Sequence, residues 1–181
     1  MIRLMIPWLA FPYLIEWLDG NFANAAILVA ALIAIVCFEN LRQGFVIESA
    51  LVTSLIGMAV VSLYWPQLSS FENTKILLYG VLSVAGWLGV LFKHPFTLQY
   101  SRAGVNEDVR QSDEFFEVNN TITKAWCITF SMNWVLAGLS LGFEEYWPVF
   151  VIGSYMSILM ASVITEVFPD AYFDRRSSVH G

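Results

Sequence analysis

The chain has 181 residues, of which 57% are hydrophobic and 13% are charged, and its formal net charge is −6 at pH 7. Soluble domains average about 25% charged residues, so this composition excludes an ordinary water-soluble domain and indicates an integral membrane protein. The acidic balance, without any basic patch in the sequence, also excludes nucleic acid as a partner.

Apolar stretches with few or no charged residues predict membrane-spanning helices, because a helix needs about 20 apolar residues to cross the hydrocarbon of a bilayer. The first, residues 4–18, contains Pro7 and Pro12 and ends in acidic residues, so it is either a tilted span or a re-entrant segment. Five longer stretches predict spans over residues 22–38, 46–65, 75–92, 121–142 and 148–168. Cleavage of a signal peptide after Ala25 is disfavoured, because it would leave the next helix too short to span. We therefore expect one all-α, polytopic membrane domain with six helices, or with five and one re-entrant segment.

The positive charges predict the orientation of these spans. With six spans, every lysine and arginine except Lys75 falls on one side of the membrane, which the positive-inside rule makes the cytoplasmic side. Both termini then face the cytoplasm. A polar segment at residues 93–118 and a tail at residues 169–181 lie on the same side.

The polar segment at residues 93–118, called the strap below, is the first candidate site. Its apolar side chains alternate at first and then recur at helical spacing opposite acidic residues, which predicts an amphipathic segment on the membrane surface. It is either a linker that keeps two spans in register or a docking platform for a partner or lipid headgroups. Anionic lipid is disfavoured because acidic residues outnumber basic ones. The side chains that would make the contact are Phe96, Leu98, Gln99, Tyr100, Arg102 and Phe116.

A group of polar side chains in the spans is the second candidate site. Lys124 is expected about one turn inside the fifth span, at a depth similar to that of Glu48 and Glu166 in two other spans. An ion pair with Lys124 would be a structural clamp or part of an ion or proton path, although Lys124 can also reach the interface alone. Thr129 and Asn133, one turn apart, are expected to bind a neighbouring helix or, less favourably, a substrate.

Small residues recur at three-residue spacing in one span and at four-residue spacing in two others, and they predict close helix packing. Gly138 and Gly142 form one such pair. The other two series comprise Gly80, Ser83, Gly86 and Gly89, and Gly153, Ser157, Ala161 and Thr165. Such surfaces can equally join two copies of the chain, so a homo-oligomer is also possible.

The sequence predicts no catalytic residue, no cofactor and no metal site. His94 and His180 lack metal-ligand spacing, and Cys37 and Cys127 lie in separate apolar stretches as small buried side chains. The common motifs for phosphate, dinucleotide, zinc or serine chemistry are missing from the sequence.

Short motifs across the chain resemble the bacterial intracellular septation protein A (YciB) family. Lys93, His94, Pro95 and Gln99 match its polar segment, Trp126 and Phe130 its fifth span, and Trp147, Phe150 and Gly153 its last. The resemblance implies a non-enzymatic scaffold or interaction protein of the bacterial inner (plasma) membrane, linked to cell-envelope synthesis or division through membrane-protein partners. The alternatives are a small transporter or channel using the Glu48, Lys124 and Glu166 cluster, and a lipid-modifying enzyme.

Overall fold

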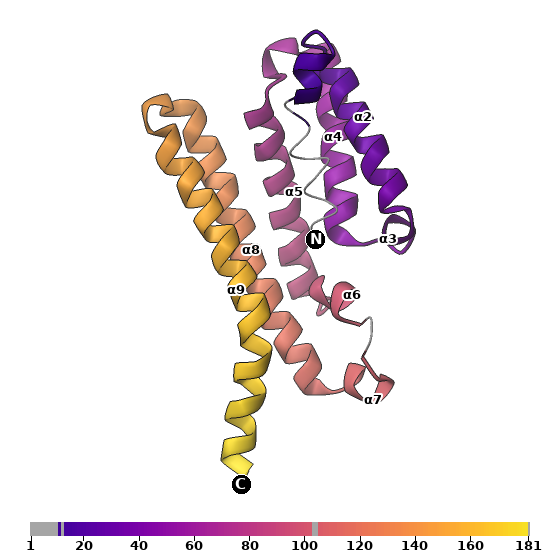
Figure 1. Ribbon diagram of the computed structural model, residues 1–181, viewed down its shortest axis with the longest axis vertical. Coiled ribbons are helices and arrows are strands. Elements are labelled where there is room, and N and C mark those ends of the chain that lie inside the picture. The colour runs from indigo at the N-terminus through magenta and orange to yellow at the C-terminus, as the bar shows by residue number, and fades with distance from the viewer. Residues whose placement is uncertain (1–10, 12, 103–104, 181) are drawn as a thin grey trace. The chain divides into compact units, whose positions relative to one another are not determined.

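The structure, a computed structural model, describes residues 11, 13–102 and 105–180, and its regular elements in this part of the chain are all helices. Residues 4–10 of the first predicted span lie outside the described residues, and residues 13–17 are helical. The helices that follow are α2 (Phe22–Val36), α3 (Phe38–Arg42), α4 (Val46–Tyr64), η1 (Pro66–Leu68), α5 (Phe71–Leu91), α6 (Thr97–Ser101), α7 (Glu107–Arg110), α8 (Asp113–Gly142), η2 (Glu144–Tyr146) and α9 (Trp147–His180). Figure 1 labels the α-helices among them.

Four of the described helices, α4, α5, α8 and α9, are long and apolar enough to cross a membrane. Helix α2 is apolar but has 15 residues, so it rises about 22 Å, less than the roughly 30 Å of a hydrocarbon core. The predicted all-helical class is confirmed for the described residues, and the four apolar helices are compatible with a membrane protein, whereas a count of six spans stays a prediction.

The chain divides into two compact units, residues 1–82 and 83–181, and α5 passes from one into the other. In the first unit, α2 packs on α4 through small and branched side chains, among them the buried Ala26, Ala30, Leu55 and Ala59. Helix α3 ends at a sharp turn in which Gly44 has a φ of 72° and the amide of Phe45 donates to the carbonyl of Asn40. This left-handed turn is the usual way to end a helix and favours glycine.

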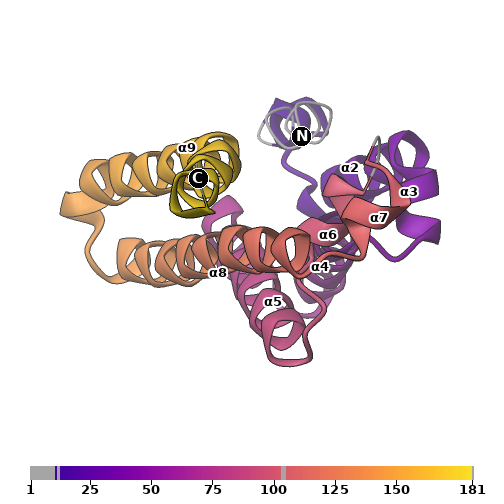
Figure 2. The same cartoon turned by 90° about the horizontal axis from the view of Figure 1, so that it is seen from below.

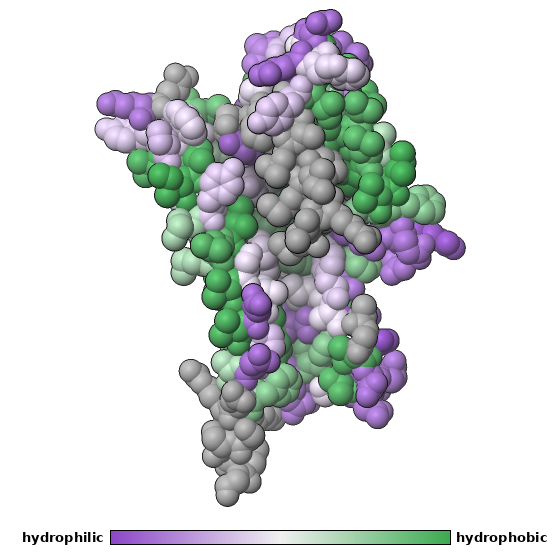
Figure 3. Space-filling view, in the orientation of Figure 1, coloured by the Kyte–Doolittle hydropathy of each residue, from purple (hydrophilic) through white to green (hydrophobic). Residues whose placement is uncertain are grey.

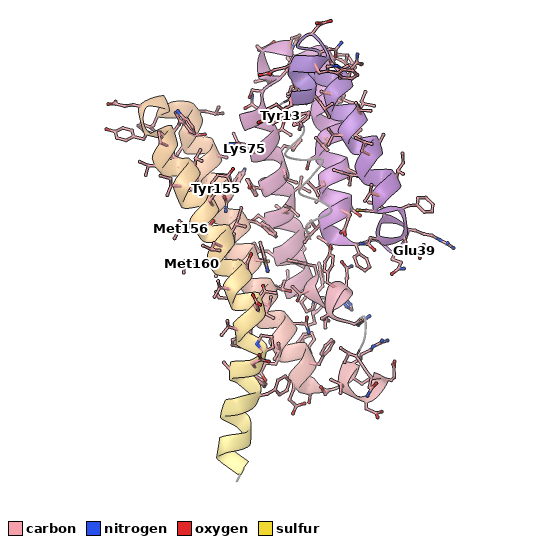
Figure 4. All side chains as sticks on the ribbon, viewed as in Figure 1. Tyr13, Glu39, Lys75, Tyr155, Met156 and Met160 are labelled. Atoms are coloured by element: carbon pink, nitrogen blue, oxygen red, sulfur yellow. The ribbon has the colours of Figure 1, made fainter. Side chains whose placement is uncertain are left out.

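In the second unit, α8 and α9 run side by side as an antiparallel hairpin (Figures 1 and 2). Figure 4 shows Tyr155, Met156 and Met160 on α9, and all three side chains are exposed. Figure 3 shows hydrophobic surface over α2 and the middle of α9, and hydrophilic residues gathered at α7. Exposed apolar side chains along a helix of this length are what a lipid-facing surface requires.

The structure differs most from the predicted boundaries at the start of α8 and the end of α9. Helix α8 begins at Asp113, not at residue 121, so the last residues of the predicted strap are its first turns. Ser112 caps this helix by accepting from the amide of Phe115, and Asp113 and Glu114 suit the positive end of the helix dipole. Helix α9 continues through Pro169, so the predicted tail is helical up to residue 180.

Candidate functional site

The membrane boundaries along the α8–α9 hairpin follow from its aromatic residues and its length. Phe143, Tyr146 and Trp147 are exposed at the turn between the helices, the position of an interfacial aromatic belt. From there, about 20 residues at 1.5 Å each cover the roughly 30 Å of hydrocarbon and end near Thr123 on α8 and Glu166 on α9. The hairpin therefore extends beyond the hydrocarbon on the predicted cytoplasmic side. This extension, residues 113–122 and 167–180, is called the stalk.

The strap begins with an aromatic anchor. Phe96 is only 3% exposed, and its ring centroid lies 6.2 Å from that of Phe130 on α8. A Cβ atom on Gly86 would lie 3.7 Å from the Phe96 ring and 2.6 Å from the Sγ of Cys127, so only glycine fits there without displacement of a neighbour. Gly86, one of the small residues predicted to form a packing groove on α5, thus contacts α8 and the start of the strap.

The turn that leads from α5 into the strap is tight and strained. The amide of His94 donates to the carbonyl of Gly89 at 2.7 Å, and that of Lys93 donates to Val90 at 3.2 Å. Lys93 adopts a φ of 58°, which side chains other than glycine rarely take. A Cβ atom on Gly89 would come within 2.8 Å of the backbone oxygen of His94. The close approach of the returning chain therefore requires glycine at position 89.

Hydroxyl and amide groups then join the strap helix α6 to α8. The hydroxyl of Thr97 donates to the carbonyl of Asn119 at 2.7 Å and, because its proton is used there, accepts from the hydroxyl of Thr123 at 2.8 Å. Ser101 donates to the Oδ1 of Asn119 at 2.7 Å. Thr123 and Asn119 are buried, so these bonds form near the inner boundary of the hydrocarbon, where water competes less. They hold α6 at one level of α8.

A second polar contact joins α5 to α8 within the apolar stretches of both helices. The hydroxyl of Ser131 donates to the carbonyl of Cys127 and accepts from the hydroxyl of Ser83 at 2.7 Å and from the indole N–H of Trp87 at 3.1 Å. The polar atoms of this group are thereby paired, as low-dielectric surroundings require. Its role is to fasten the two helices.

Three side-chain hydrogen bonds join α8 to α9 along the hairpin. The Nδ2 of Asn133 donates to Ser157 at 2.7 Å, the indole of Trp126 to Thr165 at 2.9 Å, and the hydroxyl of Tyr172 to Glu117 at 2.6 Å. Ala161, between two of these contacts, is buried. The prediction that Gly153, Ser157, Ala161 and Thr165 form a packing seam is confirmed, with α8 as the partner.

Asn133, in the middle of α8, is a polar side chain with no exposed surface. Its Nδ2 donates to the carbonyl of Thr129 and to Ser157, while its Oδ1 is buried and has no partner in the described part of the chain. If the side-chain amide of Asn133 were flipped, its Oδ1 would face the carbonyl oxygen of Thr129, and neither atom could donate. The observed orientation is therefore the favourable one. The prediction that Thr129 and Asn133 bind a neighbouring helix is confirmed for Asn133.

The charged residues of the second candidate site are not brought together in the hairpin. Lys124 and Glu166 are both exposed, and within the described ranges no ion pair joins them. Trp126 faces α9. Residues two positions apart in a helix are separated by about 200° around the helix axis, so the side chain of Lys124 points away from α9. Glu48 belongs to the first unit, where it is 2% exposed and accepts from the Nδ2 of Asn40 at 2.8 Å.

The strap residues predicted to contact a partner have different surroundings. Phe96 is buried in the α5–α8 contact, which corrects its expected role as an exposed docking residue. Leu98, Gln99 and Tyr100 are half-buried on α6, Arg102 is exposed, and Phe116 is half-buried within α8. The predicted single surface segment is instead two short helices, α6 and α7. Because α7 connects to the start of α8, ten residues before the expected boundary near Thr123, we expect it to lie about 15 Å along the stalk from the hydrocarbon.

Sequence reasoning missed the contacts made by Thr97, Ser101 and Thr123. The available signal was a pair of matching spacings: Thr97 and Ser101 lie four residues apart, as do Asn119 and Thr123, so each pair occupies one face of a helix. Among the described residues, no group of three or more histidine, cysteine or acidic side chains is placed to hold a metal ion. Comparison of the chain with family models, curated proteins and solved structures finds no match.

Proposed function

We propose that this chain is a non-enzymatic scaffold of the bacterial inner membrane that holds membrane-protein partners of cell-envelope synthesis or division at its cytoplasmic face. The observation that supports this proposal is the fixed strap. Phe96 anchors its start, and hydrogen bonds from Thr97 and Ser101 hold α6 against α8. A segment held in one position loses little conformational entropy when a partner binds it, which is the physical advantage of a scaffold.

The partner-facing part of the strap is proposed to lie beyond its anchor. Arg102, Glu107, Asp108 and Val109 are exposed, and the 45% exposure of Val109 gives α7 an apolar side chain among charged ones. The distance of α7 from the hydrocarbon favours a protein partner over lipid, because headgroups extend only about 5–8 Å from the hydrocarbon.

The competing proposal of a transporter or channel receives less support from this geometry. An ion or proton path through Lys124 and Glu166 requires these groups to meet within the membrane, but both are exposed at the calculated inner boundary. Their positions suit side chains that extend to the interface. Purified protein in proteoliposomes should therefore show no flux above empty vesicles, and flux that depends on Glu166 would favour the transporter.

Photo-crosslinking in intact bacterial cells tests the scaffold directly. A benzoylphenylalanine at position 109 should form an adduct with a defined membrane protein of the envelope or division machinery. The same probe at position 160, where Met160 is exposed on the membrane-spanning part of α9, is the control and should not form that adduct. Arg102→Ala should weaken the position-109 adduct without lowering the amount of folded protein. Identical adducts from both positions, or none from any exposed strap position, would contradict the proposal.

A further inference from the structure

We draw no further inference here: the strongest candidate, the surface patch on the cytoplasmic end of α9 where Val167 and Phe173 are exposed beside Glu166 and Asp170, is an acidic and apolar helix face, and nothing in the structure shows what covers it.

Discussion

At the scale of single residues, the end of α5 is where the backbone constrains the sequence most. Gly89 and Lys93 both belong to the turn that reverses the chain, but a different physical constraint acts at each position. Position 89 requires the absence of a side chain because the backbone returns close to it. Position 93 requires a left-handed conformation, which lysine adopts at a cost of roughly 1–2 kcal/mol.

Gly89→Ala should destabilise the protein, because the added methyl group would meet the carbonyl oxygen of His94, a backbone atom that cannot move alone. The expected loss in the free energy of unfolding is about 1–3 kcal/mol, the usual cost of overpacking. Thermal unfolding in detergent measures this loss. Gly138→Ala is the matched control, since nothing lies within 4 Å of a Cβ atom there, and it should unfold at or slightly above the temperature of the parent protein, because alanine favours a helix over glycine. Equal behaviour of the two variants would refute the close approach at Gly89.

Lys93→Gly should stabilise the protein relative to Lys93→Ala. Both variants remove the same charge, but only glycine adopts a φ of 58° without strain. The difference between their free energies of unfolding should be about 1 kcal/mol in favour of glycine. Chemical denaturation of the two variants, side by side in the same detergent, measures it. If alanine proved as stable as glycine, residue 93 would not hold the left-handed conformation.

At the scale of elements, the strap owes its position to α8 more than to its own helical propensity. Helix α6 has five residues, too few for a stable isolated helix, so tertiary contacts must hold it. Its hydroxyl groups bond to Asn119 and Thr123. Loss of these bonds is expected to free α6 while leaving the apolar contact of Phe96.

Thr97→Val should loosen the strap, because valine keeps the shape of threonine but leaves the Asn119 carbonyl and the Thr123 hydroxyl without this partner. Loss of these two hydrogen bonds costs on the order of 1–3 kcal/mol. Hydrogen exchange of the backbone amides at residues 97–101 should become faster, whereas exchange in the membrane-spanning part of α9 should not change. Thr121→Val, at a half-buried position of α8 outside this network, is the control and should leave strap exchange unchanged. Unchanged exchange in Thr97→Val would show that these hydrogen bonds do not hold the strap.

Helix faces, helix caps and side-chain directions explain why some elements were predictable from the sequence and others were not. The seam from Gly153 to Thr165 was visible in the sequence because small residues at four-residue spacing lie on one helix face. The start of α8 was placed too late because polarity suggested a strap, whereas a helix continues through polar residues when its cap is satisfied, as at Ser112. The Lys124–Glu166 ion pair was predicted only because both residues were expected at a similar depth in the membrane. Depth does not specify the direction of a side chain around its helix, and the contacts of Trp126 decide that direction.

At the scale of the whole molecule, the proposed function depends on which residues of α8 lie in water and which lie in lipid. A helix of 30 residues is about 45 Å long, half as long again as the hydrocarbon is thick. Lys124 stands at the calculated boundary, with the charged stalk on one side and an uncharged stretch on the other. This arrangement predicts that α7 and the stalk lie in water on one face of the membrane, where a partner can reach them.

Single cysteines along α8 should therefore show three zones of reactivity towards a membrane-impermeant maleimide in intact and inverted vesicles. Cysteines at positions 113 and 117, on the stalk, should react only from the cytoplasmic side. Those at 128 and 135 should stay unlabelled although their side chains are exposed, because lipid surrounds them. A cysteine at 145 should react only from the opposite side. The native Cys37 and Cys127 are buried, so the parent protein supplies the baseline. Labelling at 128 from either side, or labelling of 117 and 145 from the same side, would overturn the assignment of α8 as a span with a cytoplasmic stalk, and with it the placement of the strap on which the scaffold proposal depends.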